Sequence, residues 1–381
     1  MQQQPLLPAD ALAWRRFPAP SPLGTQKDIR YIGSHARGVL NGPETTGMEF
    51  WSINPYVGCA FGCAYCYARY THRHVSERAI DQLEEDSGTA EALLELPGWL
   101  SFERRIFVKQ NAAAALREQL ASRGPRVARL LGGETLLVGT ATDPYQPAER
   151  RYRVTRDVLE VLAMYRGLRV VVTTKSPLVV RDLDVLARLG SRSRLTVHMS
   201  LITMDRVLAR RIEPRAPTPD ARLRAMRRLC ESGIDVGVNI MPVLPGISDS
   251  PAMLRTLLRH VADAGVSHVH ACALRLQPAA RRRYLPFLAA EFPTLAPRYA
   301  IAYAEEDRMN ERYTAGLLRF MERAGREMGL PLHTLGRSAA NEHEGTAPGR
   351  QATADSPCAD LPAGDVRGNT AMYAPQLELS L

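Results

Sequence analysis

Three cysteines in one short segment are the residues of this sequence best suited to chemistry. Cys59, Cys63 and Cys66 follow a C-x3-C-x2-C spacing, and Gly58 and Gly62 stand directly before the first two. Thiolates are soft ligands that suit zinc, copper(I) or iron–sulfur centres. Glycines let the chain wrap tightly around an object larger than one ion. Three cysteines on a four-iron cluster leave one iron without a protein ligand, which is the open position that a catalytic metal centre needs.

A zinc site is the alternative interpretation of the same segment. It would use Cys63 and Cys66 with His72 or His74, and Cys59 as the remaining ligand. Zinc sites usually combine two ligand pairs separated by a longer loop, and this sequence has no second cysteine pair. The spacing therefore favours an iron–sulfur cluster.

Alternating strands and helices are predicted to position these cysteines. The predicted strands are apolar runs, and the segments between them carry apolar residues at helical spacing. Strands are expected at 49–53, 135–141, 168–174, 195–201, 235–241 and 268–276, with helices at about 155–165, 179–186, 218–232 and 252–264. This pattern predicts an α/β fold built as a partial (β/α)6 barrel, a relative of the eight-unit barrel. In such barrels the functional residues lie at the C-terminal ends of the strands.

Composition divides the chain into four regions. Residues 1–46 are rich in Pro, Gly and Gln and are expected to form an extension draped over the core or loosely ordered. Residues 47–290 are expected to form the barrel, and 291–335 a helical segment packed against it. Residues 336–381 are rich in Ala, Gly, Pro and Ser, so we expect a disordered tail in which Cys358 is not a ligand.

The cysteine segment resembles a known family. The spacing, with the aromatic Tyr65 before the last cysteine, resembles the signature of the radical S-adenosylmethionine (SAM) superfamily. More narrowly, NPYVGCAFGCAYCYAR, TDPYQPAE, VTTKSP and the stretch around EPRAP resemble the spore photoproduct lyase-related group, whose members are often described as DNA repair photolyases. The resemblance covers about residues 47–330. It implies a 4Fe–4S cluster held by Cys59, Cys63 and Cys66, with SAM bound to the free iron.

The resemblance also implies an activity. An electron from the reduced cluster would cleave SAM to methionine and a 5′-deoxyadenosyl radical, which would abstract hydrogen from a substrate that the sequence does not identify. A reductant such as flavodoxin or ferredoxin is implied as a partner. Two alternatives stay open: a radical SAM modifier of a peptide, RNA or small molecule, and a non-catalytic zinc protein associated with nucleic acid.

Four residues near the ends of predicted strands are candidates for SAM binding by this resemblance, together with Tyr65. Thr142 and Asp143 follow the second strand and would receive the SAM ammonium group; the alternative is a turn-forming Asp-Pro pair. Lys175 follows the third strand and would pair with the SAM carboxylate, unless it is a surface lysine. Ser200 would bond the ribose or carboxylate, unless it is a core serine bonded to backbone.

Arg215, in the Glu-Pro-Arg segment, is a further candidate for the SAM carboxylate or ribose, and the alternative is a solvated arginine. The last predicted strand places His268, His270 and Cys272 on one face and Arg275 on the other. The resemblance points Arg275 into the barrel, so we expect the histidine and cysteine face to contact the outer helices rather than to form a second metal site.

Thr140 aligns with the position where spore photoproduct lyase carries a cysteine that returns a hydrogen atom to the repaired base. A hydroxyl cannot replace that thiol, because its O–H bond is far stronger than an S–H bond. The sequence therefore predicts radical generation without the native repair reaction. Cys272 would substitute for the missing thiol only if its face turned inward.

The net charge of +9 and a pI near 9.4 permit an acidic partner such as nucleic acid. Arginine accounts for nearly all of the positive charge, since Lys27, Lys109 and Lys175 are the three lysines. Solvated helix faces are the favoured explanation of this charge. The sequence shows neither a signal-peptide core nor an apolar run of membrane-spanning length. We therefore expect a cytoplasmic protein without a membrane partner.

Overall fold

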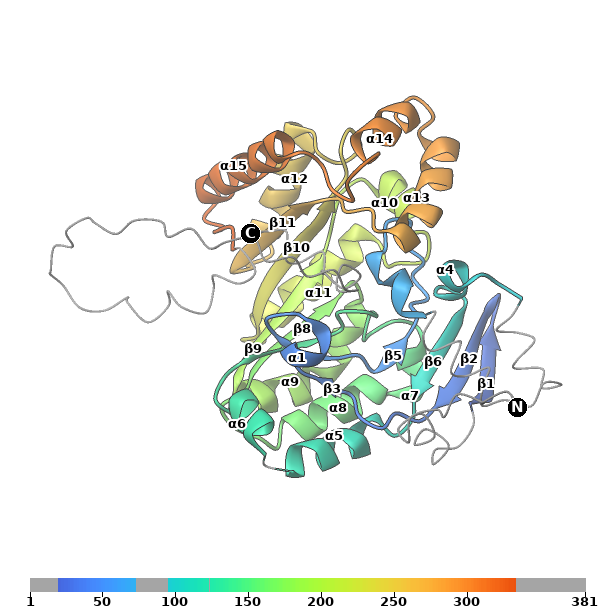
Figure 1. Ribbon diagram of the computed structural model, residues 1–381. Coiled ribbons are helices and arrows are strands. Elements are labelled where there is room, and N and C mark those ends of the chain that lie inside the picture. The colour runs from blue at the N-terminus through green and yellow to red at the C-terminus, as the bar shows by residue number, and fades with distance from the viewer. Residues whose placement is uncertain (1–19, 73–94, 123, 334–381) are drawn as a thin grey trace, which may run out of the picture.

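The computed structural model describes residues 20–72, 95–122 and 124–333, which form a curved sheet covered by helices (Figure 1). The main sheet has seven strands in the order β11-β10-β9-β8-β7-β4-β3. Its six parallel strands are β4 (Trp51–Ile53), β7 (Thr135–Val138), β8 (Arg169–Thr174), β9 (Arg194–Ser200), β10 (Asp235–Val243) and β11 (His268–Ala273). The predicted partial six-unit barrel is confirmed, with a short antiparallel strand, β3 (Leu40–Asn41), added at the β4 edge.

Two of the predicted strands end earlier than expected. β7 stops at Val138 because Gly139 has a φ of +98°, and a Cβ there would lie 2.4 Å from the Cδ of Pro144. The chain turns there, so the following polar residues sit on a loop above the sheet. β11 ends at Ala273 instead of residue 276.

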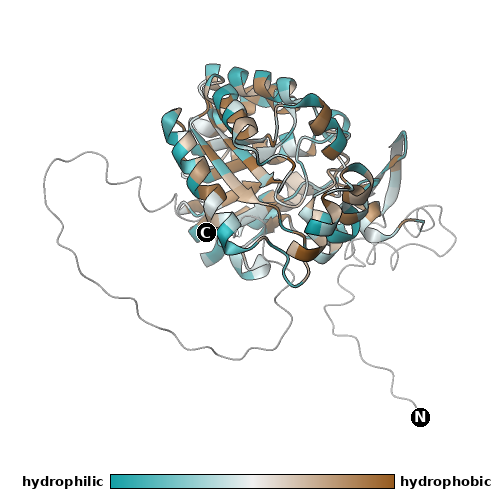
Figure 2. Cartoon of the chain, turned by 90° about the horizontal axis from the view of Figure 1, so that it is seen from above, coloured by the Kyte–Doolittle hydropathy of each residue, from teal (hydrophilic) through white to brown (hydrophobic). Residues whose placement is uncertain are grey.

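Helices follow the parallel strands, and most of them bury their apolar sides against the sheet. The helices are α8 (Val154–Leu162), α9 (Leu183–Gly190), α10 (Arg206–Ile212), α11 (Pro219–Glu231) and α12 (Pro251–Ala262), and α5 (Ala112–Ala121) packs on α8. The helix α10 instead packs Leu208 and Ile212 into the apolar cluster around the cysteine loop. Side-chain caps start several of them: the Thr218 hydroxyl accepts from the backbone of α11, and the Ser250 hydroxyl from that of α12. Figure 2 shows the resulting division, with apolar strands inside and polar helix surfaces outside.

A second, four-stranded sheet stands beside the barrel and was not predicted. Its order is β1-β2-β6-β5, with β1 at Ser21–Gln26, β2 at Ile29–Ser34, β6 at Arg105–Lys109 and β5 at Tyr56–Val57. Part of the segment expected to be draped over the core or loosely ordered is regular structure, since residues 21–41 supply two strands to this sheet and one to the main sheet. β5 leads directly into the cysteine segment, so the second sheet supports one side of it.

Three helices follow the barrel: α13 (Pro278–Glu291), α14 (Ala296–Ala302) and α15 (Glu311–Glu327). α15 packs against β11 and α12, as expected for the C-terminal helical segment (Figure 1). The predicted disordered tail at 336–381 lies outside the described residues. Among the described helices, none combines the length and apolar character needed to cross a membrane.

Candidate active site

The cysteine loop, residues 58–66, is held in shape by backbone hydrogen bonds to three other parts of the chain. The amide of Cys59 donates to the carbonyl of Phe102 at 2.9 Å, and the amide of Ala64 donates to the carbonyl of Ile212 at 2.9 Å. The amide of Ala60 donates to Oε1 of Gln146 at 2.9 Å. Gly58 has a φ of +84°, and a Cβ there would lie 2.7 Å from the Phe102 carbonyl oxygen. The loop therefore requires glycine at this position.

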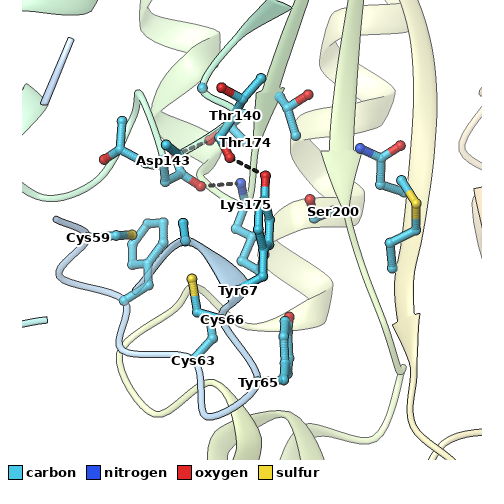
Figure 3. A pocket seen from close by; sticks show the side chains of 18 of the residues that line it. Cys59, Cys63, Tyr65, Cys66, Tyr67, Thr140, Asp143, Thr174, Lys175 and Ser200 are labelled. Carbon is cyan, nitrogen blue, oxygen red and sulfur yellow. Dashed lines mark hydrogen bonds between the residues drawn. The ribbon is translucent and has the colours of Figure 1, made fainter. Parts of the chain in front are cut away.

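All three cysteines of the loop border one pocket at the C-terminal ends of the barrel strands, which we call the cofactor pocket (Figure 3). Burial raises the pKa of Cys59 to about 12 and also raises the pKa of Cys63 and Cys66. A thiolate in such surroundings needs a cationic centre to compensate its charge.

The donor set of the cysteine loop suits an iron–sulfur cluster, because three thiols from one short loop border the same pocket. Three thiols on one pocket, with one side open, match the donor set of a 4Fe–4S cluster that keeps a free iron.

The zinc alternative finds no support at His72. Its Nε2 lies 2.8 Å from the carbonyl oxygen of Arg105, and its ring packs beside Phe102 and Phe107. Burial lowers the pKa of His72 to about 4, so the ring is a neutral core group. His74 lies outside the described residues.

Asp143 and Thr142 line the cofactor pocket from the loop after β7, and both also fix neighbouring backbone. The Asp143 carboxylate accepts hydrogen bonds from the Thr174 hydroxyl at 2.6 Å and from the Lys175 amide at 2.7 Å (Figure 3). It also accepts from the Tyr145 amide at 2.9 Å. The Thr142 hydroxyl donates to the Gly58 carbonyl at 2.6 Å, so this side chain ties the cysteine loop to the barrel.

Lys175 stands at the end of β8 with its ammonium group in the cofactor pocket. Its Nζ lies 4.0 Å from Oε1 of Glu213 and 5.7 Å from the centre of the Tyr65 ring. Glu213 also accepts from the Tyr65 hydroxyl and pairs with Arg222. Although burial alone raises the pKa of Glu213, Arg222 and Lys175 hold it below its ordinary value. Lys175 is therefore a partly buried cation that lines the pocket, and not a lysine on the open surface.

The floor of the cofactor pocket is made by Ser200 on β9 and by Asn239 and Met241 on β10. Ser200 and Asn239 are paired in register, so their side chains stand next to each other. Oδ1 of Asn239 is buried and lacks a hydrogen-bond partner among the described residues. A buried acceptor without a donor is costly, so this atom is suited to a donor on a bound molecule.

The Arg215 side chain supports the outside of the cysteine loop and is not among the residues that line the cofactor pocket, so a contact with SAM stays a prediction. Its Nε donates to the Ala60 carbonyl at 2.6 Å, and its Nη2 donates to the Glu103 carbonyl at 3.2 Å. A Cβ at Gly62 would lie 2.5 Å from Nη2 of Arg215, which explains the glycine there.

The expected orientation of the last strand is wrong. His268 and His270 of β11 pair in register with Gly237 and Asn239 of β10, and Asn239 faces the cofactor pocket. Since alternate residues share a face, the histidines and Cys272 point into the barrel. Arg275 lies beyond the strand end, where it pairs with Asp307, so its direction does not show which face of β11 points into the barrel.

The sequence comparison agrees with this geometry. The family model of the radical SAM superfamily matches residues 53–258, more than half of the chain, including the whole cysteine loop. This chain belongs to the radical SAM superfamily. An uncharacterized protein of Mycobacterium tuberculosis is 34% identical over 262 residues, which cover 68% of this chain and 69% of that protein. An uncharacterized protein of Methanocaldococcus jannaschii is 25% identical over 221 residues, 58% of this chain and 70% of that protein.

Among solved structures, this radical SAM chain resembles spore photoproduct lyase complexed with dinucleoside spore photoproduct. The TM-score is 0.54 at 16% identity, and the match covers 79% of this chain and 81% of the lyase. At this identity the likeness concerns the fold.

Four residues of this radical SAM site were missed from the sequence. They are Asn239 in the floor, Glu213 beside Lys175, Gln146 under the cysteine loop, and Tyr67, whose hydroxyl donates to the Thr140 carbonyl. A polar Asn inside an apolar strand was a usable signal for the first. Glu213 and Gln146 act through partners far away in sequence, so local patterns do not mark them.

Proposed function

We propose that this radical SAM protein binds a 4Fe–4S cluster through Cys59, Cys63 and Cys66 and abstracts a hydrogen atom from its substrate. The observation that carries the proposal is that three thiols and two opposite charges, on Asp143 and Lys175, share one pocket. When bound, the reduced cluster and SAM supply the radical that removes the hydrogen. The protein binds both groups and excludes water.

The charges of the cofactor pocket suit the amino acid end of SAM, which carries an ammonium and a carboxylate. Lys175 is placed to pair with the carboxylate. The Asp143 carboxylate offers about four acceptor positions, and the three hydrogen bonds described above leave room for the ammonium group. Tyr65 holds Glu213, and Glu213 in turn orients Lys175. The unpartnered Oδ1 of Asn239, next to Ser200, suits a ribose hydroxyl.

Nucleic acid is the substrate class that we propose. The positive net charge of the chain and the fold of spore photoproduct lyase support it. Thr140 lines the cofactor pocket with its hydroxyl bonded to Asn54 at 3.1 Å, so the radical chemistry takes place without a thiol at that position.

The test compares two cysteine variants after anaerobic reconstitution with iron and sulfide. The parent and a Cys230→Ala control, altered on helix α11 away from the pocket, should each hold about four irons per chain and form 5′-deoxyadenosine from SAM when reduced. Cys63→Ala should lose the cluster absorbance and the cleavage. Unchanged cleavage in Cys63→Ala, or a parent that binds one zinc and no iron at the loop, would contradict the proposal.

A further inference from the structure

Three histidines meet inside the lower half of the barrel, outside the cofactor pocket. His198 comes from β9, and His268 and His270 come from β11; we call them the histidine cluster. All three are buried, and each offers a ring nitrogen within 4.8 Å of the other two. Nε2 of His198 lies 3.1 Å from Nε2 of His268. Neutral imidazoles are common ligands of zinc and other first-row metals.

The strand between the histidines carries a glycine where they need space. Gly237 of β10 is the register partner of both His198 and His268. A Cβ at Gly237 would lie 2.4 Å from Nε2 of His268 and 2.8 Å from Cδ2 of His198. Any other residue would therefore fill the space in which the two Nε2 atoms face each other.

The hydrogen bonds around Ser267 favour a proton on Nδ1 of His268, on the outer side of its ring. The Ser267 hydroxyl donates to Oδ1 of Asp235 at 2.6 Å, and the hydroxyl oxygen of Ser267 itself lies 2.7 Å from Nδ1 of His268. An oxygen that has given its hydrogen to a carboxylate accepts the proton of Nδ1. The lone pair of His268 is then on Nε2, which faces His198. Metal-binding histidines commonly donate a hydrogen bond from the ring nitrogen that does not bind the metal. Here Ser267 would accept that bond from Nδ1 and pass it on to the carboxylate of Asp235.

The remaining two rings also offer lone pairs. His198 and His270 are both buried, and burial favours the neutral form of an imidazole. Nδ1 of His270 is buried and has no hydrogen-bond partner among the described residues. If the three rings served for packing alone, Nδ1 of His270 would stay unsatisfied. The facing Nε2 atoms of His198 and His268 would then share a single proton.

The geometry points to a metal site: we propose that His198, His268 and His270 bind one Zn²⁺, with water as the fourth ligand. Tetrahedral zinc with bonds of about 2.0–2.1 Å places two ligand nitrogens about 3.3 Å apart, close to the 3.1 Å between the facing Nε2 atoms. The ligand nitrogen of His270 lies within 4.8 Å of the other two. The carboxylate of Asp235 offsets part of the added charge through Ser267.

The site joins the open edge of the barrel to the segment after α15. The ring of His333 stacks on His268 with centres 4.6 Å apart, and the His333 amide donates to the Val269 carbonyl at 2.9 Å. His198 and His268 flank Gly237, which precedes Asn239 by two residues on β10, so this pair lies one layer below the floor of the cofactor pocket. This position, away from the C-terminal ends of the strands, indicates a structural role.

The test measures zinc and iron together in the reconstituted holoprotein after dialysis against a weak chelator. The parent and a His35→Asn control, altered at an exposed histidine, should keep about one zinc per chain beside the iron of the cluster. His268→Asn, and Gly237→Ala, which fills the metal space without removing a ligand, should lose at least nine-tenths of the zinc at unchanged iron content. X-ray absorption at the zinc edge should show imidazole scattering and no Zn–S shell near 2.3 Å.

Three results would overturn the proposal: a parent without zinc, a Zn–S shell, or His268→Asn with the zinc content of the parent. Thermal unfolding separates metal loss from misfolding, because a ligand that binds the native state raises the melting temperature. Zinc should raise the melting temperature of the metal-stripped parent and leave the melting temperature of a folded His198→Asn variant unchanged. Equal shifts in the two proteins would also refute the site.

Discussion

Replacing Lys175 with alanine should weaken SAM binding and leave the cluster in place. The Lys175 side chain is 17% exposed and its Nζ lies 4.0 Å from Oε1 of Glu213. Its loss leaves Glu213 paired with Arg222, so the surrounding fold keeps its charge balance. A charge-assisted contact to the SAM carboxylate contributes about 1.5–3 kcal/mol, which corresponds to a Kd roughly 10- to 150-fold higher in the variant.

The assay is an equilibrium titration of the anaerobically reconstituted protein with SAM. Lys27→Ala is the matched control, since Lys27 is an exposed lysine on the β1–β2 turn. Iron content and cluster absorbance should be the same in parent, control and Lys175→Ala, and Lys175→Arg should restore part of the affinity. A Lys175→Ala protein with an intact cluster and the parental Kd would refute the assignment of this side chain to the carboxylate.

Two further predictions concern the cysteine loop and the fate of the substrate radical. Arg215→Ala should lower cluster retention during dialysis without changing the Kd for SAM in the protein that still holds a cluster, because Arg215 holds the Ala60 carbonyl and lies outside the pocket lining. Iron analysis measures the first effect and titration with SAM the second. A raised Kd at full iron content would instead assign Arg215 to SAM binding. Dinucleotide spore photoproduct should yield little clean thymidylyl-thymidine with the reduced parent, because Thr140 lacks a thiol, and product analysis by liquid chromatography checks this. Efficient repair that disappears in Cys272→Ala would contradict it and assign the hydrogen donor to the inward face of β11.

The sequence predicted those parts of the molecule that depend on neighbouring residues. The cysteine loop lies in one short segment, and its glycines and cysteines together mark its chemistry. The strands and helices of the barrel carry their own apolar periodicity, so their bounds were predicted to within a few residues. Lys175 and Ser200 follow from this, because each stands at the end of a strand that the pattern locates.

Long-range pairing explains what the sequence did not reveal. The second sheet pairs β2 with β6, whose residues are separated by about 75 positions (Arg30 with Arg105, for example), and neither strand alternates clearly. The alternation on β11 was visible, but alternation defines two faces without saying which one is inside. Arg275 was used to choose between them, and the strand ends before that residue. His198 lies on another strand, so the histidine cluster appeared only when the register was known.

The hydrogen bonds made by the backbone amides of the cysteine loop bear on how the protein would respond to oxygen. The amides of Cys59, Ala60 and Ala64 all donate to protein acceptors, so the shape of the loop does not depend on bonds to a metal. If the loop binds the proposed cluster, we expect the chain to fold first and the cluster to enter a loop that is already formed. We also expect a protein that has lost its iron to oxygen to remain folded and to accept iron and sulfide again.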